Sequence, residues 1–537
     1  MRVILITITL AALAAAQQPA AQQPKDMCFP PPSSVAPSLP AKLLSGQGEF
    51  NFPITTSNPE AQKFFNQGIA QMHSFWAREA ERSFLQAAAL DPEAPMPHWG
   101  VAMVAAGDYR PGFQLDQYRS VSGYQPLNPG HRAIKAALKA QELSAKATDL
   151  EKLYIASIAA RRTGNTIKVD ADYLQGLRDL LVKYPKEVEA RTYLALQIMG
   201  GFEMPGHGPR PGSLEAVEIL TQLTLEAPNH AGVHHYVIHG WEGASFAKEA
   251  WDSSKRYAEL VTNIPHALHM PGHIYSQTGK LDEALKSFTD AAVNERYWMG
   301  TDSLYGNGHH GHNVHYLATV ATYKGDYDTA ISAAKELLAM PETPREASAL
   351  DNFQTAYKQG WFSMLRTLVE AERWDDILAG RMLPEINKPR QLAWRHWAMA
   401  VAFASRGQVK AAEHEAKMMD AALEDFTKRT KFKAPEELAA GRLELEAHIL
   451  IANKKISSGL KRFAMAAAAQ RKLRYSEPPW YPRPVSVVQG SVALKYRKFK
   501  EAKQAFAFAL EEIPNWTRAE QGNKQVMAFL AQPTEAP

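Results

Sequence analysis

Residues 61–92 read AQKFFNQGIAQMHSFWAREAERSFLQAAALDP, and this stretch decides the fold. Small residues and one aromatic stand at fixed places in a frame of about 34 residues: Gly68 at position 8, Ala80 at 20, Phe84 at 24, Ala87 at 27 and Pro92 at 32. Small side chains at positions 8 and 20 let two helices approach closely, and the ring at position 24 fills the gap between units. A proline at position 32 ends the second helix. The stretch therefore predicts two antiparallel helices joined by a short turn.

The same frame recurs along the chain. Strong copies begin at Pro265, Gly311 and Arg483, and weaker copies begin near Ala231, Ala393 and Ala440. This pattern resembles the tetratricopeptide repeat, which is a helix-turn-helix unit. We therefore expect an all-α fold, a TPR-like α-solenoid of antiparallel helix pairs that spans residues 49–537. Stretches 104–130, 200–214 and 292–310 fall out of frame and are rich in Gly, Pro and Tyr, so we expect loops there.

The first 48 residues differ from the rest. Arg2 is followed by an apolar run from Val3 to Ala16 that ends in small residues, and this is typical of a signal peptide over residues 1–16. Residues 17–48 are rich in Gln, Pro and Ala and are expected to form a flexible leader. Cys28 lies in this leader and is interpreted as an incidental thiol. We expect an exported protein, periplasmic or extracellular.

Composition excludes several classes of function. Sixty Lys and Arg residues oppose 56 Asp and Glu residues, so the net charge of +4 predicts no nucleic-acid partner. No later segment has the ~18 consecutive apolar residues of a membrane span, so we expect no membrane contact after signal cleavage. A single cysteine excludes an internal disulfide framework and a thiolate-rich zinc site. The chain also lacks the HExxH motif of metalloproteases, the GxSxG elbow and the phosphate-binding P-loop.

Histidines gather in the central repeats, within residues 230–340. Eleven of the 18 histidines lie between His230 and His315. In the tetratricopeptide family, positions 2, 5, 9 and 12 of the first helix line the concave groove. Eight side chains fall at these positions in three successive repeats: His235, His239 and Glu242, then His266, His269 and His273, then His312 and His315. Residues three or four apart share a helix face, so each set predicts a stripe of ligands facing the groove.

Imidazoles from neighbouring helices can converge on one ion, because packed helix axes lie roughly 8–10 Å apart. Nitrogen ligands with one carboxylate suit a divalent transition metal such as zinc, copper or iron. We predict a metal site at these eight residues, mononuclear or dinuclear, with Glu242 as a carboxylate ligand or a catalytic general base. A metal-activated water would support hydrolysis, and an iron or copper centre would support oxidation.

A second hypothesis is that the groove binds a peptide or protein partner without metal, with the histidines as hydrogen-bonding groups. His230 and His234 fall off the stripe and are expected to pack or to support the ligands. His309 and His310 are expected to cover the site or to face solvent. Pro271 lies between His269 and His273, so the helix there is expected to bend or to begin at Pro271.

Several segments together are similar to a family of large exported bacterial tetratricopeptide-repeat proteins of largely unassigned function. They are FFNQG (64–68), HWG (98–100), HYVIH (235–239), HMPGHIY (269–275), HNVH (312–315) and PWYP (479–482). The resemblance implies an α-solenoid and implies that the histidine motifs belong together. It implies no particular reaction. Members often carry cysteines just before the Trp-Gly pair, whereas this chain has Ala94 to His98 there, so no cysteine chemistry is carried over.

Overall fold

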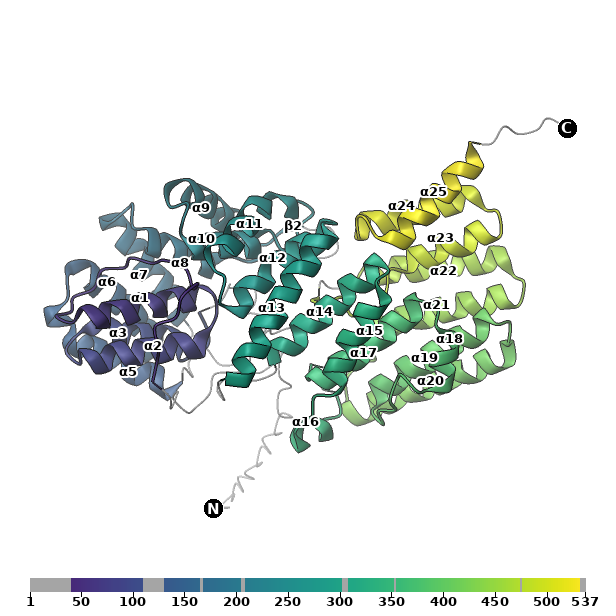
Figure 1. Ribbon diagram of the computed structural model, residues 1–537, viewed down its shortest axis with the longest axis horizontal. Helices are drawn as coiled ribbons and strands as arrows, with labels where there is room; N and C mark the ends of the chain where they lie inside the picture. The colour runs from purple at the N-terminus through teal and green to yellow at the C-terminus, as the bar shows by residue number, and fades with distance from the viewer. Residues whose placement is uncertain are drawn as a thin grey trace, which may run out of the picture.

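The computed structural model of the protein is an elongated molecule built mainly of helices, which follow one another in antiparallel pairs (Figure 1). The structure describes residues 40–109, 130–164, 168–203, 208–301, 308–351, 354–473 and 476–531. The signal peptide, Cys28, leader residues 17–39 and loop residues 305–307 lie outside these ranges. None of the described helices is long and apolar enough to cross a membrane.

The first half of the described chain contains α1 (Pro59–His73), α2 (Ala77–Leu90), α3 (Pro95–Val104), α5 (His131–Leu143), η1 (Ser144–Lys146), α6 (Asp149–Thr163), α7 (Val169–Lys183), α8 (Val188–Ile198), β1 (Phe202–Glu203), β2 (Gly208–Pro209), α9 (Ser213–Glu226), α10 (Ala231–Trp241), η2 (Ala247–Ala250), α11 (Trp251–Leu260), α12 (Pro265–Gln277) and α13 (Leu281–Thr301). The strands β1 and β2 form a short antiparallel hairpin in which Phe202 lies opposite Pro209.

The second half contains α14 (Gly308–Lys324), α15 (Tyr327–Leu338), α16 (Pro344–Ser348), α17 (Ala356–Glu370), α18 (Trp374–Ala379), α19 (Pro389–Ser405), α20 (Val409–Thr430), α21 (Glu436–Ala452), α22 (Ile456–Gln470), α23 (Val485–Lys495), α24 (Phe499–Glu512) and α25 (Thr517–Leu530). Most consecutive helices pack on each other, as in α1 with α2, α12 with α13 and α23 with α24, whereas the short α16 is passed over and α15 packs on α17. This is the antiparallel helix-pair solenoid that the repeat frame predicts.

The turn inside each pair repeats the same backbone conformation. Position 15 of the frame has a positive φ in every copy that the sequence frame identifies, apart from the copy at Ala231: Phe75, Gly279, Gly325, Gly407, Lys454 and Arg497. A left-handed residue ends one helix and turns the chain toward the next. The shared conformation at a shared frame position confirms the repeat register independently of the residue types that defined it.

The aromatic residue at position 24 packs where the frame predicts. A Cβ atom added to Gly68 or to Gly100 would lie 2.5 Å from ring atoms of Phe84. Phe84 therefore lies between the small residue of its own repeat and that of the next. Gly490 and Gly522 flank Phe506 in the last repeats in the same way. Glycine is required at these crossings because any side chain would meet the ring.

Three expectations about irregular segments need correction. The stretch 292–310 is not a loop throughout, because α13 continues to Thr301 with Ala292, Glu295 and Trp298 buried on its inner face. Helix α12 does not begin at Pro271 but runs through it from Pro265 to Gln277; the alternative of a bend at Pro271 stays a prediction. Residues 40–48, expected in the leader, pack against the repeats; the carbonyl of Gly46 accepts hydrogen bonds from the amides of Thr262 and Asn263 at 2.8 Å each.

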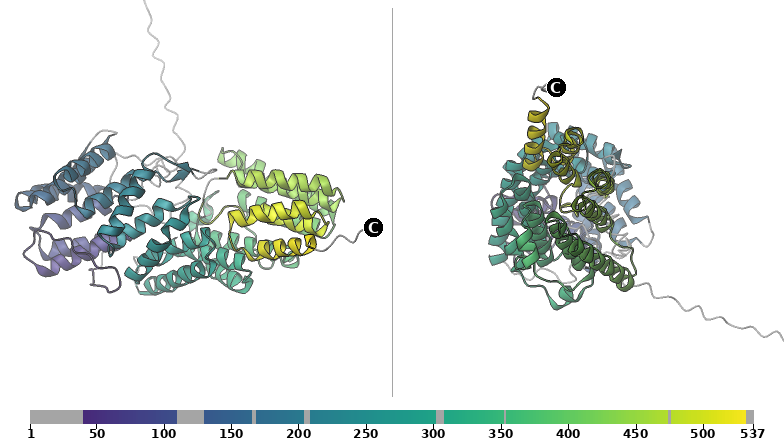
Figure 2. Two further views of the ribbon diagram at one scale, coloured as in Figure 1. Left: turned by 90° about the horizontal axis from the view of Figure 1, so that it is seen from above. Right: turned by 90° about the vertical axis from the view of Figure 1, so that its right-hand side faces the viewer.

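Two apolar cores follow one another along the long axis. One core extends from Phe52 to Trp298 and the other from Leu281 to Val526. The helices wind about a common axis, as the end-on view shows (Figure 2). The C-terminus closes the second half on itself: Asn515 Nδ2 donates to the carbonyl of Gly279 at 2.9 Å, and Thr517 Oγ1 donates to the carbonyl of Lys324 at 3.1 Å. Helices α10, α12 and α14 lie where the two cores meet.

Candidate metal centre

Three neighbouring helices supply the predicted ligands. Helices α10, α12 and α14 are the first helices of their pairs, and α12 packs beside both of the others. Because residues four apart share a helix face, His235 lies next to His239 on α10 and His269 next to His273 on α12. Six histidines of these helices have exposed fractions of 7% or less: His235, His239, His266, His269, His273 and His312. The helix packing thus gathers them in the interior.

One triad consists of His235, His239 and His266. One nitrogen of each residue lies within 4.8 Å of the other two, and the Nε2 atoms of His235 and His266 are 3.2 Å apart. Nitrogens that bind one zinc ion at about 2.0–2.1 Å in tetrahedral geometry lie roughly 3.3 Å from each other. The spacing of this triad, named triad A, therefore suits a common ion.

Hydrogen bonds fix the ring orientation in triad A. His235 Nδ1 lies 2.5 Å from the backbone carbonyl of His73. A carbonyl only accepts, so Nδ1 carries the proton and the lone pair of Nε2 faces the triad. His239 Nδ1 lies 3.1 Å from Glu242 Oε2, and its Nε2 is buried with no hydrogen-bond partner among the described residues. A buried polar atom without a partner costs about 1–3 kcal/mol, and a bound ion would remove that cost.

The second triad, triad B, consists of His269, His273 and His312. His269 Nε2 lies 2.5 Å from His273 Nε2 and 3.2 Å from His312 Nε2. His269 Nδ1 lies 2.8 Å from Asn313 Oδ1. The amide of Asn313 donates to the carbonyl of Phe288 at 2.9 Å, which fixes Oδ1 as the acceptor. His269 therefore also presents a bare Nε2 to its triad.

Two carboxylates lie against the triads. Glu242 contacts one histidine of each: its Oε2 lies 3.1 Å from His239 Nδ1, and its Oε1 contacts His273 Nδ1. Glu477, from the loop between α22 and α23, places Oε1 3.2 Å from the same His273 Nδ1. A carboxylate on the second nitrogen of a ligating imidazole orients the ring and makes it more basic. One carboxylate thus connects both triads.

Burial keeps most of the imidazoles neutral. Loss of hydration lowers the pKa well below the usual histidine value in four triad residues, and the neighbouring imidazoles lower it further: His235, His266, His269 and His312. A neutral imidazole is the form that binds a metal. The centre is therefore ready to bind an ion at neutral pH with little proton release from these four residues.

At His273, the carboxylates of Glu477 and Glu242 raise the pKa instead of leaving it lowered by burial. Burial alone would lower the pKa of His273, but Glu477 and Glu242 outweigh it and raise this pKa to about 10. Burial and the charge of Glu242 raise the pKa of Glu477 to about 8. Burial would raise the pKa of Glu242 too, but the charge on His273 and hydrogen bonds from Glu477 and His239 hold it well below the usual value. Negative charge therefore concentrates on Glu242.

The structure brings six of the eight predicted residues into the triads, with Glu242 between them. His315 lies elsewhere: its Nδ1 is 3.3 Å from Gln359 Oε1 and its Nε2 is 3.3 Å from Arg366. Sequence reasoning missed Glu477 and Asn313. Asn313 follows His312 in the HNVH motif and was visible there, whereas nothing in the sequence connects Glu477 to the histidines. Whether Glu242 also ligates an ion stays a prediction.

His309 and His310 do not face solvent. His309 Nε2 lies 3.2 Å from His266 Nδ1, and its Nδ1 contacts Glu295. His310 lies between Glu295 and Glu336, at 2.8 Å and 2.9 Å, and these carboxylates raise its pKa to about 9 against the effect of burial. These contacts place His309 behind triad A as a support for His266.

A third group, His73, His230 and Glu189, also places three possible ligand atoms within 4.8 Å of one another, but each histidine nitrogen in it has a hydrogen-bond partner. His73 lies between Tyr236 and Glu189, with its ring nitrogens 3.0 Å and 2.8 Å from their side-chain oxygens. His230 accepts from the amide of Val233 at 3.1 Å and contacts Glu189 at 2.9 Å. This group caps α10 and ties α1, α8 and α10 together, as expected of a packing role for His230.

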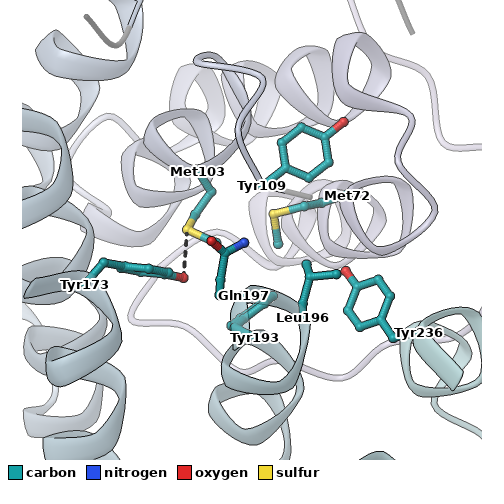
Figure 3. Close-up of a pocket in the computed structure, with 8 residues that line it drawn as sticks. All are labelled: Met72, Met103, Tyr109, Tyr173, Tyr193, Leu196, Gln197 and Tyr236. Atoms are coloured by element: carbon teal, nitrogen blue, oxygen red, sulfur yellow. Dashed lines mark hydrogen bonds between the residues drawn. The ribbon is translucent and has the colours of Figure 1, made fainter. Parts of the chain in front are cut away.

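A pocket beside this group is walled by tyrosines and methionines (Figure 3). Met72, Met103 and Leu196 contribute its apolar surface, and Tyr173 donates to the sulfur of Met103 at 3.7 Å. The space between the side chains is too narrow to hold a water molecule. None of the residues of the triads lines it, so it is not a substrate cavity of the centre.

Comparison with known proteins adds little at the site. No protein-family model matches the chain, and no curated protein matches it. The crystal structure of the P58(IPK) TPR domain covers 89% of this chain and 99% of its own length at 12% identity, with a TM-score of 0.22. The APC/C hetero-tetramer Cut9–Hcn1 covers 88% and 90% at 11% identity, with a TM-score of 0.28. The repeat assignment rests instead on the helix pairs and their turns.

Proposed function

We propose that this protein binds transition-metal ions at triads A and B. One observation carries the proposal: twice within one buried cluster, nitrogens of three histidines lie within 4.8 Å of one another. Hydrogen bonds between the rings do not account for every donor nitrogen, because His239 Nε2 is buried with no hydrogen-bond partner among the described residues and a bound ion would satisfy it. His266 and His269 lie one helical turn apart on α12, so the two ions would be neighbours.

The donor set suits zinc, copper or iron. Each triad offers only imidazole nitrogens, and the negative charge of the nearby Glu242 partly balances the charge of a divalent ion. Three histidines leave one coordination position open, as in catalytic zinc sites. A bound ion would supply Lewis acidity for hydrolysis, or redox chemistry if it is copper or iron. If the protein is an enzyme, it would be of one of these two kinds, with Glu242 holding His239 and His273 in place.

The competing hypothesis, a peptide-binding groove, receives less support at these residues. The triad histidines are nearly inaccessible, so they do not present hydrogen-bonding groups to an extended peptide. A protein or peptide partner at another face stays a prediction. We also propose export to the periplasm or the extracellular space, on the strength of residues 1–16. N-terminal sequencing of the mature protein would test export: an intact Met1 would contradict it.

Elemental analysis tests the metal proposal. The wild-type protein, purified without chelators, is compared with His235→Ala/His239→Ala and His269→Ala/His273→Ala. The control is His396→Ala, which alters a partly buried histidine of α19 that pairs with Glu415 of α20. We expect two equivalents in the wild type and the control and about one in each double variant, with circular dichroism confirming that each remains folded. No stoichiometric metal after loading with zinc, copper, iron and manganese would overturn the proposal.

A further inference from the structure

The two triads are closed to solvent, so an ion needs a way in. Exposure of the triad side chains does not exceed 7%, and the side chain of Glu242 is 4% exposed. The side chain of Glu477 is 19% exposed. Of Glu242 and Glu477, the carboxylates described against triad histidines, Glu477 has the more exposed side chain, while its Oε1 is buried against His273.

Glu477 lies on a loop rather than a helix, and one arginine holds this loop. Arg366, buried in α17, donates from Nε to the carbonyl of Pro482 at 3.0 Å and contacts the carbonyls of Pro479 and Tyr481. Arg366 also contacts His315 of α14. The loop is thus fixed against the helix that carries His312, and Glu477 is held over triad B. This gives His315 a positioning role away from the ions.

Glu477, Glu242 and His273 form a third group of possible ligand atoms, again within 4.8 Å of one another. This group differs from the triads in chemistry, because two of its three donors are carboxylate oxygens. Oxygen donors suit an ion that still carries part of its water shell, whereas imidazoles suit the dehydrated transition metal. His273 belongs to both sets: its Nδ1 faces the carboxylates and its Nε2 faces His269.

We infer that Glu477, Glu242 and His273 form a loading site, through which a divalent transition-metal ion passes from solvent to triad B. Glu477 takes up the ion at the surface of the loop, and Glu242 receives it next to His273. This inference rests on the proposed metal-binding function. It assigns to Glu477 control of the rate of metal uptake and release, while the histidines determine how many ions are bound at equilibrium.

Stopped-flow measurement of Co²⁺ uptake tests the inference, because absorbance bands of the cobalt–imidazole centre report occupancy directly. The metal-free wild type is compared with Glu477→Gln, with Glu477→Asp and with Glu385→Gln. Glu385 is a matched control, a loop carboxylate 68% exposed and paired with Arg395. We expect Glu477→Gln to bind as many ions as the wild type at saturating Co²⁺ but roughly tenfold more slowly, taking as a guide the 10–100-fold losses of affinity or activity that follow removal of a carboxylate beside a metal ligand. Glu477→Asp should recover part of the rate, and Glu385→Gln should match the wild type.

Three results would overturn the inference, and they can be told apart. Uptake by Glu477→Gln at the wild-type rate shows that ions enter elsewhere. Loss of one bound equivalent in Glu477→Gln shows that Glu477 is a permanent ligand. Absence of Co²⁺ binding to the wild type removes the proposed function itself and the loading site with it. Removal of bound cobalt by excess EDTA gives the release rate, which should slow in Glu477→Gln in parallel with uptake.

Discussion

At the scale of single residues, the centre depends on which nitrogen of each imidazole is left unprotonated. The carbonyl of His73 accepts a hydrogen bond from Nδ1–H of His235, and the amide oxygen of Asn313 accepts one from Nδ1–H of His269. These acceptors leave Nε2 of both histidines facing its triad. Glu242 has the same effect on His239 and contacts His273 as well. A substitution at Glu242 should therefore change metal affinity at both triads.

Glu242→Gln is expected to weaken metal binding at both triads by roughly 10–100-fold. A glutamine side chain has one acceptor oxygen and one donor nitrogen, so it can satisfy only one of the two histidine Nδ1 groups. Competition with a chromophoric chelator measures the affinity. Glu415→Gln is a matched control, because Glu415 contacts His396 Nδ1 at 2.7 Å outside the centre. Unchanged affinity in Glu242→Gln would show that Glu242 does not orient the ligands.

The sequence predicts which residues share one face of a helix, because the helical period places them together. It does not predict which loop residues will lie beside that face. His235, His239, His269 and His273 were found because spacing by four residues defines a face on one helix. The contact of α10, α12 and α14 followed from their being consecutive first helices. Glu477 lies on an irregular loop that returns from the far end of the chain, and no period encodes that return. His315 fits the periodic stripe, but its side chain contacts Gln359 and Arg366 instead of a triad.

At the scale of elements, close helix crossings determine the stability of each repeat. The added Cβ of Gly490→Ala in α23 would lie 2.8 Å from Phe506 ring atoms. The rigid ring cannot yield, so we expect a loss of about 1–3 kcal/mol in the free energy of unfolding, despite alanine's better helix propensity. Gly300→Ala in α13 is the control, with no atom within 4 Å of its Cβ, and should cost nothing. Urea unfolding compares the two variants, and equal stability would contradict the assigned register.

The end of α24 should make stability depend on pH. Burial raises the pKa of Glu512 from 4.5 to about 7. The folded state then holds this proton more tightly than the unfolded state, so its contribution to stability is full below pH 4.5 and is lost as pH rises to about 7. Glu512→Gln should remove the loss, which is at most about 1.4 kcal/mol per pH unit.

The measurement is the urea midpoint of wild type and Glu512→Gln at about pH 5 and about pH 8. Glu512→Gln should gain on the wild type only at the higher pH. Glu501→Gln, an exposed position on the same helix, should follow the wild type at both. A gain of equal size at both pH values would show that charge on Glu512 is not the cause.

At the scale of the whole molecule, the centre lies where the two apolar cores meet, which the repeat frame did not predict. The frame predicts a solenoid, and a repeat pattern predicts contacts only between repeats that are consecutive in the sequence. Closure depends on contacts between distant segments, such as Asn515 with Gly279 and His73 with Tyr236. These contacts bring the ends of each half back toward α10, α12 and α14. The histidines are therefore enclosed from both sides, which is why a groove is not left open.

Enclosure between two cores predicts that metal binding stabilises both halves together. An ion at 100 times its dissociation constant adds about 2.7 kcal/mol to the free energy of unfolding. For a chain of this length, that corresponds to a rise in Tm of roughly 2–3 °C, from the usual entropy per residue. With both triads loaded, the two ions should together give about twice this rise, and calorimetry of the metal-free and loaded protein should show it in the whole endotherm. His269→Ala/His273→Ala should show a smaller rise and His396→Ala the full one. A rise confined to one of two separate transitions would show that the halves unfold independently and that the ions do not join them.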